Sequence, residues 1–318
     1  MLPGLFPPRP ALCPRKARRP RAPHCRAQNL EELSTSHPCF ALGAKNNKGR
    51  VHLPVSPGCN LLCRFCQRDV NENYDDHRPG VSGRVISPDE AVEVLRNAIR
   101  LCPDITVAGS AGPGDTLATP YAPETFRRIR SEFPDILRCM STNGLLLNEK
   151  AKEVIDAGID TLTVTVNAVD LDILSQINSG IVWHGQICTG REASEILIEN
   201  QLKGIEKVAK AGVTIKVNTV LIPEINAKHV PEVAMQVAAR GAQLYNIIPL
   251  IPQHELDWCP RPDCALIDRT RQQAERYIRV FRHCQHCRAD AAGIPGGTDV
   301  SKQLYIRPIT LENTFSHG

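Results

Sequence analysis

The chain has 318 residues, of which 42% are hydrophobic and 23% are charged, and its net charge is +4. This length allows one large domain with a substantial core, or two small domains. No apolar run reaches the roughly 18–20 residues that cross a bilayer, so we expect a soluble, cytoplasmic protein with no membrane partner. Residues 1–28 carry seven Arg and Lys residues and no Asp or Glu, which leaves −3 for the rest. The basic excess therefore belongs to this leader, and we expect no nucleic-acid partner for the body.

The leader is also rich in proline, which removes hydrogen-bond donors, and its arginines repel one another. We therefore expect residues 1–35 to be disordered, residues 36–297 to form the core, and residues 298–318 to form a tail. The leader is an extension without a role or, as an alternative, a targeting segment. Thirteen cysteines without a secretory signal favour metal or redox chemistry over a disulfide framework.

Short β-branched runs alternate with helical stretches from residue 51 onward. A helix is predicted to begin at the capping box Ser87-Pro88-Asp89-Glu90. Glycines follow three further predicted helices, as left-handed C-terminal caps do, and a last helix is expected before the final cysteines: Asn148–Ala157, Ala193–Ala211, Val230–Arg240 and Asp268–Phe281. The predicted strands are Val51–Val55, Ile105–Ala108, Leu137–Thr142, Thr161–Val166, Thr214–Leu221 and Leu244–Pro249.

Six strands alternating with helices predict a parallel sheet with right-handed crossovers. Because six units are too few for a closed eightfold barrel, we expect an α/β fold, a partial (β/α)6 TIM-like barrel with N- and C-terminal extensions. The active site is then expected at the carboxyl ends of the strands.

Three cysteines, Cys59, Cys63 and Cys66, follow the first predicted strand with the spacing C-x-x-x-C-x-x-C. Three thiolates on one loop can bind three irons of a [4Fe–4S] cluster and leave the fourth iron open, whereas electron-transfer clusters use four cysteines. A structural zinc site would need a fourth ligand, and buried structural cysteines rarely repeat at this spacing. With Phe65 before the last cysteine, the spacing resembles the radical S-adenosylmethionine (SAM) signature. The resemblance implies that SAM chelates the open iron and is cleaved to methionine and a 5′-deoxyadenosyl radical.

Other strand ends are candidates for binding SAM. Gly112, Gly114 and Asp115 follow the second strand, where glycine lets the backbone approach a ligand and the carboxylate can accept from an ammonium group. Asn143 and Asn167 end the next two strands. Each is alternatively an ordinary hydrogen-bonded strand end.

Three stretches resemble the NifB family in particular. They are Ser36-His37-Pro38-Cys39 with His52 thirteen residues later, Arg78-Pro79-Gly80-Val81, and His283-Cys284-Gln285-His286-Cys287-Arg288-Ala289-Asp290. The resemblance covers roughly residues 36–297 and implies a short form without a NifX-like domain. It implies that two further [4Fe–4S] clusters are the substrate, and that they are fused with a carbide from SAM into a nitrogenase cofactor precursor.

The family pattern assigns ligands to both substrate clusters. Cys39, His52 and Cys139 match the ligands of one, and Cys284 and Cys287 match those of the other. Without the resemblance, Cys139 and His52 would each more often be core residues, whereas the C-x-x-C pair indicates metal binding in either reading. The implied partners are an iron–sulfur donor scaffold, a reductant such as ferredoxin, and a downstream cofactor carrier or scaffold.

The chain departs from the family pattern in places. Asp76 stands before Arg78 where the family has a glutamate considered to handle protons, and both residues are expected to assist near the clusters. Thr116 replaces a common proline, and Asn73 replaces a family cysteine. Two other functions therefore stay open. One is a radical SAM enzyme with auxiliary clusters that acts on a peptide or small molecule, and the other is a non-catalytic iron–sulfur carrier, which would need no SAM pocket.

Overall fold

The computed structural model describes residues 30–42, 47–71, 73, 76, 78, 81–285 and 287–305. An eight-stranded sheet with the order β12-β11-β10-β7-β6-β5-β1-β13 forms its centre. Neighbours from β12 to β1 are parallel, and β13 is antiparallel to β1 at the edge. The strands are β1 Gly49–His52, β5 Ile105–Ser110, β6 Leu137–Thr142, β7 Thr161–Thr165, β10 Thr214–Leu221, β11 Leu244–Pro249, β12 Val280–Phe281 and β13 Ala292–Gly293.

All six predicted strands lie in this sheet, so the predicted α/β class with a parallel sheet is confirmed. The first strand ends earlier than predicted, at His52 rather than Val55. Leu53 still donates to the carbonyl of Gly109 at 2.7 Å. Pro54 then has no N–H to continue the ladder, and the chain turns away.

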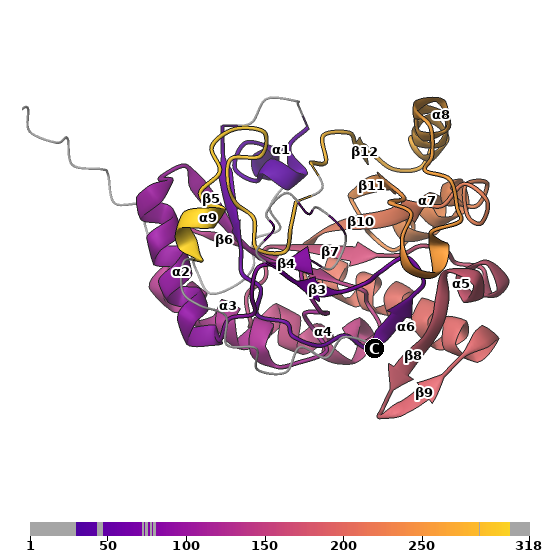
Figure 1. Ribbon diagram of the computed structural model, residues 1–318, viewed down its shortest axis with the longest axis horizontal. Coiled ribbons are helices and arrows are strands. Elements are labelled where there is room, and N and C mark those ends of the chain that lie inside the picture. Colours follow the sequence, from indigo (N-terminus) through magenta and orange to yellow (C-terminus); the bar gives the residue numbers. More distant parts are fainter. Residues whose placement is uncertain are drawn as a thin grey trace, which may run out of the picture.

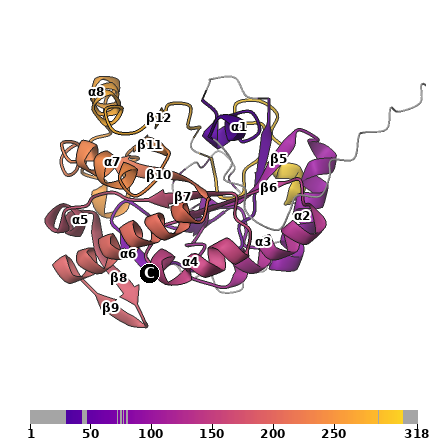
Figure 2. The ribbon, with the colours of Figure 1, turned by 180° about the vertical axis from the view of Figure 1, so that it is seen from behind.

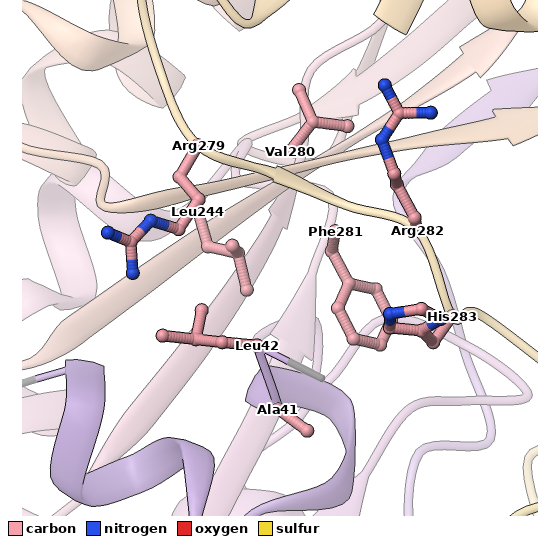
Figure 3. Close-up of a pocket in the computed structure, with 8 residues that line it drawn as sticks. All are labelled: Ala41, Leu42, Leu244, Arg279, Val280, Phe281, Arg282 and His283. Carbon is pink, nitrogen blue, oxygen red and sulfur yellow. The ribbon is translucent and has the colours of Figure 1, made fainter. Parts of the chain in front are cut away.

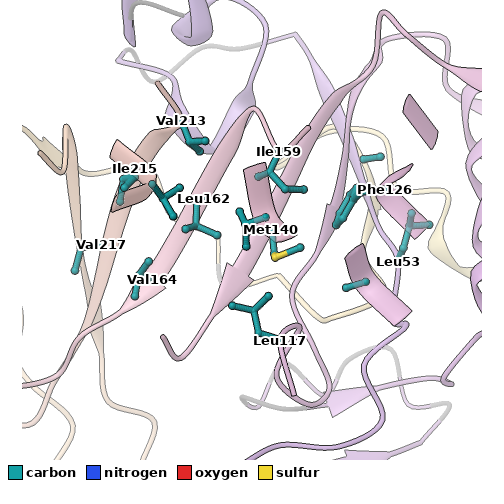
Figure 4. Packing of buried hydrophobic residues seen from close by; sticks show 14 of the residues in the cluster. Leu53, Leu117, Phe126, Met140, Ile159, Leu162, Val164, Val213, Ile215 and Val217 are labelled. Atoms are coloured by element: carbon teal, nitrogen blue, oxygen red, sulfur yellow. The ribbon is translucent and has the colours of Figure 1, made fainter. Parts of the chain in front are cut away.

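Helices cover one face of the sheet, as Figures 1 and 2 show from opposite sides. The apolar side chains on the sheet-facing sides of these helices pack against the outward-facing side chains of the strands. Together they form the largest hydrophobic core, part of which is drawn in Figure 4. Burial of these alternate strand positions supplies the main stabilisation of the fold. The helices of this layer are α2 Pro88–Leu101, α3 Tyr121–Glu132, α4 Leu147–Asp156, α6 Gly190–Lys210, α7 Val230–Ala238 and α8 Cys264–Ala274.

The start of α2 is as predicted, whereas the last helix differs. The Ser87 side chain accepts from the N–H of Glu90 while Glu90 caps the Ser87 N–H, which is a complete capping box. The prediction of a helix over Asp268–Phe281 was wrong at both ends. Asp263 caps a helix that begins at Cys264, and the chain after Ala274 instead supplies β12, which pairs with β11.

The N-terminal segment packs on the opposite face of the sheet. Residues 1–29 of the predicted leader lie outside the described residues, whereas Leu30–Ser34 form helix α1 and Pro38–Phe40 form the 3-10 helix η1. Leu33 and Phe40 are fully buried there against Val107, Leu137 and Phe281. This second core holds Cys39 against the inner face of the barrel.

The inner face of the sheet is polar. Strand side chains alternate between faces, and the outward positions Val51, Met140 and Ile215 pack under the helices. Their strand neighbours on the inner face include Arg50, His52, Cys139, Thr163, Lys216, Asn218 and Asn246. Parallel strands covered on both faces usually read as near-continuous hydrophobic runs, so this polar row marks the interior as a site.

Smaller elements complete the described chain. A three-stranded sheet has the order β2-β8-β9, and a two-stranded sheet joins β3 and β4. No helix in the described part of the chain is long and apolar enough to cross a membrane. The elements are β2 Leu61–Cys63, β3 Asp69–Val70, β4 Val81–Ser82, β8 Asn178–Trp183, β9 Gln186–Cys188, α5 Leu171–Ile177, η2 His254–Leu256 and α9 Ser301–Leu304.

Candidate active site

The three-cysteine loop lies after β1, beyond the carboxyl edge of the sheet. Its middle forms β2, which pairs antiparallel with β8, and the N–H of Cys66 donates to the carbonyl of Cys63 at 3.0 Å. Phe65 is buried in a hydrophobic cluster that is separate from the main core. Its carbonyl accepts a hydrogen bond from Gln253 at 2.7 Å. The aromatic residue before the last cysteine therefore anchors the loop to the body.

The three thiols share one electrostatic environment. Burial raises the pKa of Cys59 to about 11 and also raises the pKa of Cys63 and Cys66. Arg68 opposes this in all three because its positive charge favours the thiolate. Iron binding requires thiolates, so neighbouring thiols beside one cation suit a cluster that deprotonates them on binding.

No three His, Cys, Asp or Glu side chains among the described residues are grouped so as to bind a single metal ion. In a cubane each cysteine binds a different iron, so its ligands surround the cluster and do not converge on one point.

The Gly112–Asp115 loop packs directly on the cysteine loop. Gly114 N–H donates to the carbonyl of Ser56 at 2.7 Å, and Asp115 N–H donates to that of Gly58 at 2.8 Å. A Cβ on Gly114 would lie 1.9 Å from the Gly58 oxygen, so only glycine fits. Gly112 has φ +136°, a conformation that glycine alone adopts readily. The two loops thus form one unit at the strand ends.

Asp115 is fully engaged by the protein. Its carboxylate accepts from the N–H of Asn143 at 2.6 Å, the N–H of Leu117 at 3.0 Å, and the hydroxyl of Thr142 at 3.0 and 3.1 Å. Burial raises the pKa of Asp115, and these donors oppose the shift by favouring the carboxylate. In this geometry Asp115 fixes the end of β6, and its oxygens are occupied by protein donors rather than directed at an ammonium group.

Asn143 connects that strand end to the cysteine loop. Its Nδ2 donates to Asn60 Oδ1 at 2.8 Å and lies 3.5 Å from Cys59 Sγ. Thr116, where the family pattern has proline, is buried and donates to the carbonyl of Ser141 at 2.6 Å. The threonine therefore joins the glycine-containing loop to β6, so this departure from the pattern has a structural use here.

Asn167 lies just beyond β7 and is nearly fully buried. Its Oδ1 accepts from the N–H of Val220 at 3.0 Å, and its carbonyl accepts from Asn226 at 2.9 Å. Asn167 thus holds the ends of β7 and β10 together. Its carboxamide oxygen is used within the protein.

His52 and Cys139 lie in one row across the sheet. His52 in β1 pairs in register with Gly109 in β5, and Gly109 pairs with Cys139 in β6. A Cβ on Gly109 would lie 3.2 Å from His52 Cδ2 and 3.8 Å from Cys139 Cβ, so the glycine leaves room between them. Cys39 reaches the same interior from η1, where burial raises its pKa and the nearby Cys287 and Cys139 also raise it. The structure therefore brings together Cys39, His52 and Cys139, three residues far apart in sequence.

The His52 ring is held in one tautomer. Nδ1 lies 3.0 Å from the carbonyl oxygen of Arg288, so Nδ1 carries the proton and Nε2 keeps a free lone pair. Burial, together with the positive charges of Arg50 and Lys216, lowers the pKa of His52 to about 4. The imidazole is therefore neutral at pH 7, which is the form that binds iron.

The C-terminal cysteine pair borders the same region. Cys284 packs on the inner hydrophobic cluster with Cys39 and Cys139, and Cys287 Sγ accepts from Arg50 Nη2 at 2.9 Å. A cavity of about 220 Å³ lies beside this segment, where Leu42 and Leu244 point toward one another and His283 lines the wall (Figure 3). Both cysteines lie on the segment between β12 and β13, which are the strands at the two opposite edges of the sheet.

Asp76 and Arg78 form an ion pair beside the site. Arg78 Nη2 lies 2.6 Å from Asp76 Oδ2, and this partner holds the pKa of Asp76 well below its usual range. The carboxyl is therefore ionised at neutral pH and a poor proton donor. Arg288 fixes this segment by donating to the carbonyls of Asn73 at 2.6 Å and Asp76 at 3.0 Å.

Comparison with known proteins defines the class. Residues 53–237 match the radical SAM superfamily. A radical SAM methyltransferase from Sphaerobacter thermophilus has a TM-score of 0.56 at 17% identity, covering 77% of this chain and 71% of that protein. Streptococcus suis SuiB has a TM-score of 0.55 at 11% identity, covering 74% and 50%. These likenesses show the fold. The sheet, the three-thiolate loop and this match define a radical SAM enzyme, a class that uses a [4Fe–4S] cluster and SAM.

Curated relatives define the family within that class. The FeMo cofactor biosynthesis protein NifB of Methanocaldococcus jannaschii is 43% identical over 283 residues, covering 89% of this chain and 94% of that protein. The NifB of Methanocaldococcus infernus is 41% identical over 276 residues, covering 87% and 91%. That of Klebsiella pneumoniae is 38% identical over 302 residues, covering 92% and 64%. The chain belongs to the NifB family.

Several site residues were not found from the sequence. Arg68 beside the thiols, Arg50 beside Cys287, and Lys216 on the inner face were not singled out. Lys216 had a detectable signal, since it interrupts the otherwise apolar and β-branched start of a central strand. Arg288 and Asp290 belong to the stretch that resembles the family, but their spacing predicts no structural role for them.

Proposed function

We propose that this enzyme fuses two [4Fe–4S] clusters into an eight-iron nitrogenase cofactor precursor and inserts a carbide derived from SAM. Its relatives are FeMo cofactor biosynthesis proteins by name, and we extend that role to this chain. The single observation that carries the proposal is the convergence of Cys39, His52 and Cys139 on the inner face of the barrel, beneath the three-cysteine loop. An enzyme with only a SAM-cleaving cluster has no use for these ligands.

The donor set of this inner site suits a substrate that must later leave. Two thiolates and one neutral imidazole hold a cluster less firmly than four thiolates, and the free Nε2 of His52 is available for iron. Cys284 and Cys287 are proposed to hold the second cluster. Both lie on the same side of the molecule as Cys39, so the two guests would be neighbours.

The chain's own residues prepare the SAM-cleaving centre. Cys59, Cys63 and Cys66 would bind the cluster, which together with SAM supplies reductive cleavage of the sulfonium. Gly112 and Gly114 keep the backbone close to the cysteine loop, and the Asp115 network fixes Asn143 beside Cys59. Asn167 holds the adjoining strand ends. Glycine at both loop positions allows this close packing, because a Cβ would meet Gly58 or Ala289.

The proposal implies partners of defined chemistry. A low-potential reductant such as ferredoxin is needed because SAM cleavage consumes an electron. An iron–sulfur donor scaffold must load the substrate clusters, and a carrier or scaffold must accept the product.

Anaerobic reconstitution of the full chain tests this function. We expect about twelve irons in three [4Fe–4S] clusters, and loss of the EPR signals of two clusters when SAM and reductant are added. His52→Ala should keep SAM cleavage to deoxyadenosine but lose cluster conversion. His184→Asn is a matched control, since His184 is exposed, has φ +47°, and asparagine tolerates this conformation.

The opposing outcome is equally specific. If deoxyadenosine forms while every auxiliary cluster signal stays unchanged in the native chain, the auxiliary clusters are not the substrate. That result would instead support a radical SAM enzyme acting on a peptide or small molecule. Normal conversion by His52→Ala would remove this histidine from the ligand set.

A further inference from the structure

Two buried cations face the interior of the barrel and have no acidic partner in the part of the chain that the structure describes. Lys216 in β10 and Arg50 in β1 are each only 6% exposed. Both occupy inward positions, because their neighbours Ile215 and Val51 pack outward under the helices. Within the described ranges, neither forms an ion pair with an Asp or Glu.

Lys216 lies against the segment that carries Cys39. Its Nζ donates to the Cys39 carbonyl at 3.0 Å and lies 4.8 Å from the ring centroid of Phe40 and 5.3 Å from that of Phe281. An ammonium has three donors, and one carbonyl takes only one of them.

Arg50 plays the corresponding part beside the C-terminal cysteine pair. Its Nη1 donates to the carbonyl of Gly293 at 2.8 Å and its Nη2 to Cys287 Sγ at 2.9 Å. Its Nε is buried and has no hydrogen-bond partner. The two terminal nitrogens of the guanidinium therefore donate to protein acceptors. Its Nε–H has no acceptor among the described residues.

Burying an unpaired cation is strongly unfavourable unless an anion or several acceptors approach it. Two such cations flank the thiols Cys39, Cys139 and Cys287. The thiolate and sulfide sulfurs carry the negative charge at the surface of a bound cluster, and a reduced [4Fe–4S] core with two thiolates and a neutral imidazole is a net anion. A bound cluster would therefore bring negative charge next to Lys216 and Arg50.

We propose that Lys216 and Arg50 form the cationic wall that holds the anionic iron–sulfur substrate, with Lys216 facing the cluster at Cys39 and Cys139, and Arg50 facing the Cys287 thiolate. This inference rests on the proposed function, which supplies the guest. It assigns both residues as positioning residues that act by charge. They need not be iron ligands.

The test isolates iron bound outside the SAM-cleaving loop. The parent is the full chain with Cys59→Ala, Cys63→Ala and Cys66→Ala, reconstituted anaerobically with iron and sulfide. Lys216→Met and Arg50→Met remove each charge and keep similar length. Lys216→Arg and Arg50→Lys keep the charge, and Lys203→Met removes an exposed cation from α6 as a control. Three quantities are measured: iron per chain after chelator challenge, the midpoint potential, and thermal unfolding of the cluster-free protein.

We expect Lys216→Met and Arg50→Met each to release iron about tenfold faster than the parent, since each loses a close charge interaction. The midpoint potential should fall by up to about 59 mV, which is a tenfold change for one electron, because a nearby cation stabilises the reduced cluster. The cluster-free variants should unfold at an unchanged or higher temperature, because an unpaired buried charge has been removed. Lys216→Arg and Lys203→Met should retain iron as the parent does.

A merely structural role predicts the opposite combination. Cluster-free variants that unfold earlier or fail to fold, or variants that retain iron at the parental potential, would overturn the inference and leave the proposed function intact. A parent that binds no iron at all would overturn the proposed substrate sites, and this inference with them.

Discussion

The carbonyl oxygen of Arg288 lies 3.0 Å from Nδ1 of His52, two residues that are 236 positions apart in the chain. The same Arg288 forms an ion pair with Asp290 at 2.9 Å and donates to the carbonyls of Asn71, Asn73 and Asp76. Arg288, which directly follows the last cysteine, therefore sets the tautomer of His52. It also holds the segment that follows the three-cysteine loop. The C-terminal Arg-Ala-Asp stretch is thus a clamp that closes the site.

We expect the clamp to contribute strongly to stability. Arg288 and Asp290 have side-chain exposures of 3% and 0%, so removing Asp290 takes a close counter-charge away from a buried guanidinium. Asp290→Leu should lower the free energy of unfolding by about 3–5 kcal/mol in urea denaturation. The double variant Arg288→Met with Asp290→Leu should recover part of this loss. The exposed pair Arg96–Glu132 serves as the control, and Glu132→Gln should cost less than about 1 kcal/mol. Equal losses in the two pairs would contradict the clamp.

Gly114→Ala should disrupt the junction of the two site loops. The added Cβ would lie 1.9 Å from the Gly58 backbone oxygen, which cannot move aside as a flexible side chain can. We expect a loss of roughly 1–3 kcal/mol or more in unfolding free energy, together with loss of SAM cleavage in the reconstituted enzyme. Gly58→Ala is the matched control, because its Cβ would meet nothing within 4 Å. Similar behaviour of the two variants would show that the loop contact does not matter.

Asp115→Asn should displace Asn143 from Cys59. The substitution places a donor amide where the carboxylate now accepts from two N–H groups and a hydroxyl. We expect unfolding free energy to fall by about 1–3 kcal/mol, with a larger reduction in SAM cleavage than in iron content. Thr142→Val, which removes one hydroxyl donor to Asp115, should cost only about 1 kcal/mol. Unchanged SAM cleavage by Asp115→Asn would argue against its positioning role.

His229 should make stability depend on pH. Its Nε2 accepts from the N–H of Val169 at 3.0 Å, which requires a neutral ring. Burial lowers the pKa of His229, and the facing carboxylates Asp170 and Glu232 only partly oppose this. The unfolded chain therefore binds a proton more readily. The contribution of His229 to the free energy of unfolding is therefore present above the pKa of histidine in the unfolded chain, about 6.5. It is lost as the pH falls toward the lower pKa of His229 in the folded chain. The difference in unfolding free energy between native chain and His229→Asn should shrink from pH 7.5 to pH 5.5. A constant difference over this range would refute the assignment.

The sequence by itself determined the class of fold and the chemistry of the thiolate loop. Strand runs such as Leu137–Thr142 and Thr214–Leu221 were found with their observed bounds, because β-branched, buried segments between capped helices have a strong local pattern. The spacing of Cys59, Cys63 and Cys66 is also local, since all three ligands lie on one loop. The last helix was misplaced because pairing of Val280 with Tyr245, a tertiary contact, overrides helical propensity there.

Only the tertiary structure decided how the remaining site residues meet. Cys139 joins His52 through the register of three parallel strands, which no local pattern encodes. The Asp115 carboxylate accepts hydrogen bonds from Thr142 and Asn143 because these residues and Asp115 meet at one edge of the sheet. Lys216 lacks an acidic partner, among the residues described, only because the fold places it opposite Cys39. Charge, burial and register depend on which distant segments pack together, and that is fixed by the whole fold rather than by neighbouring residues.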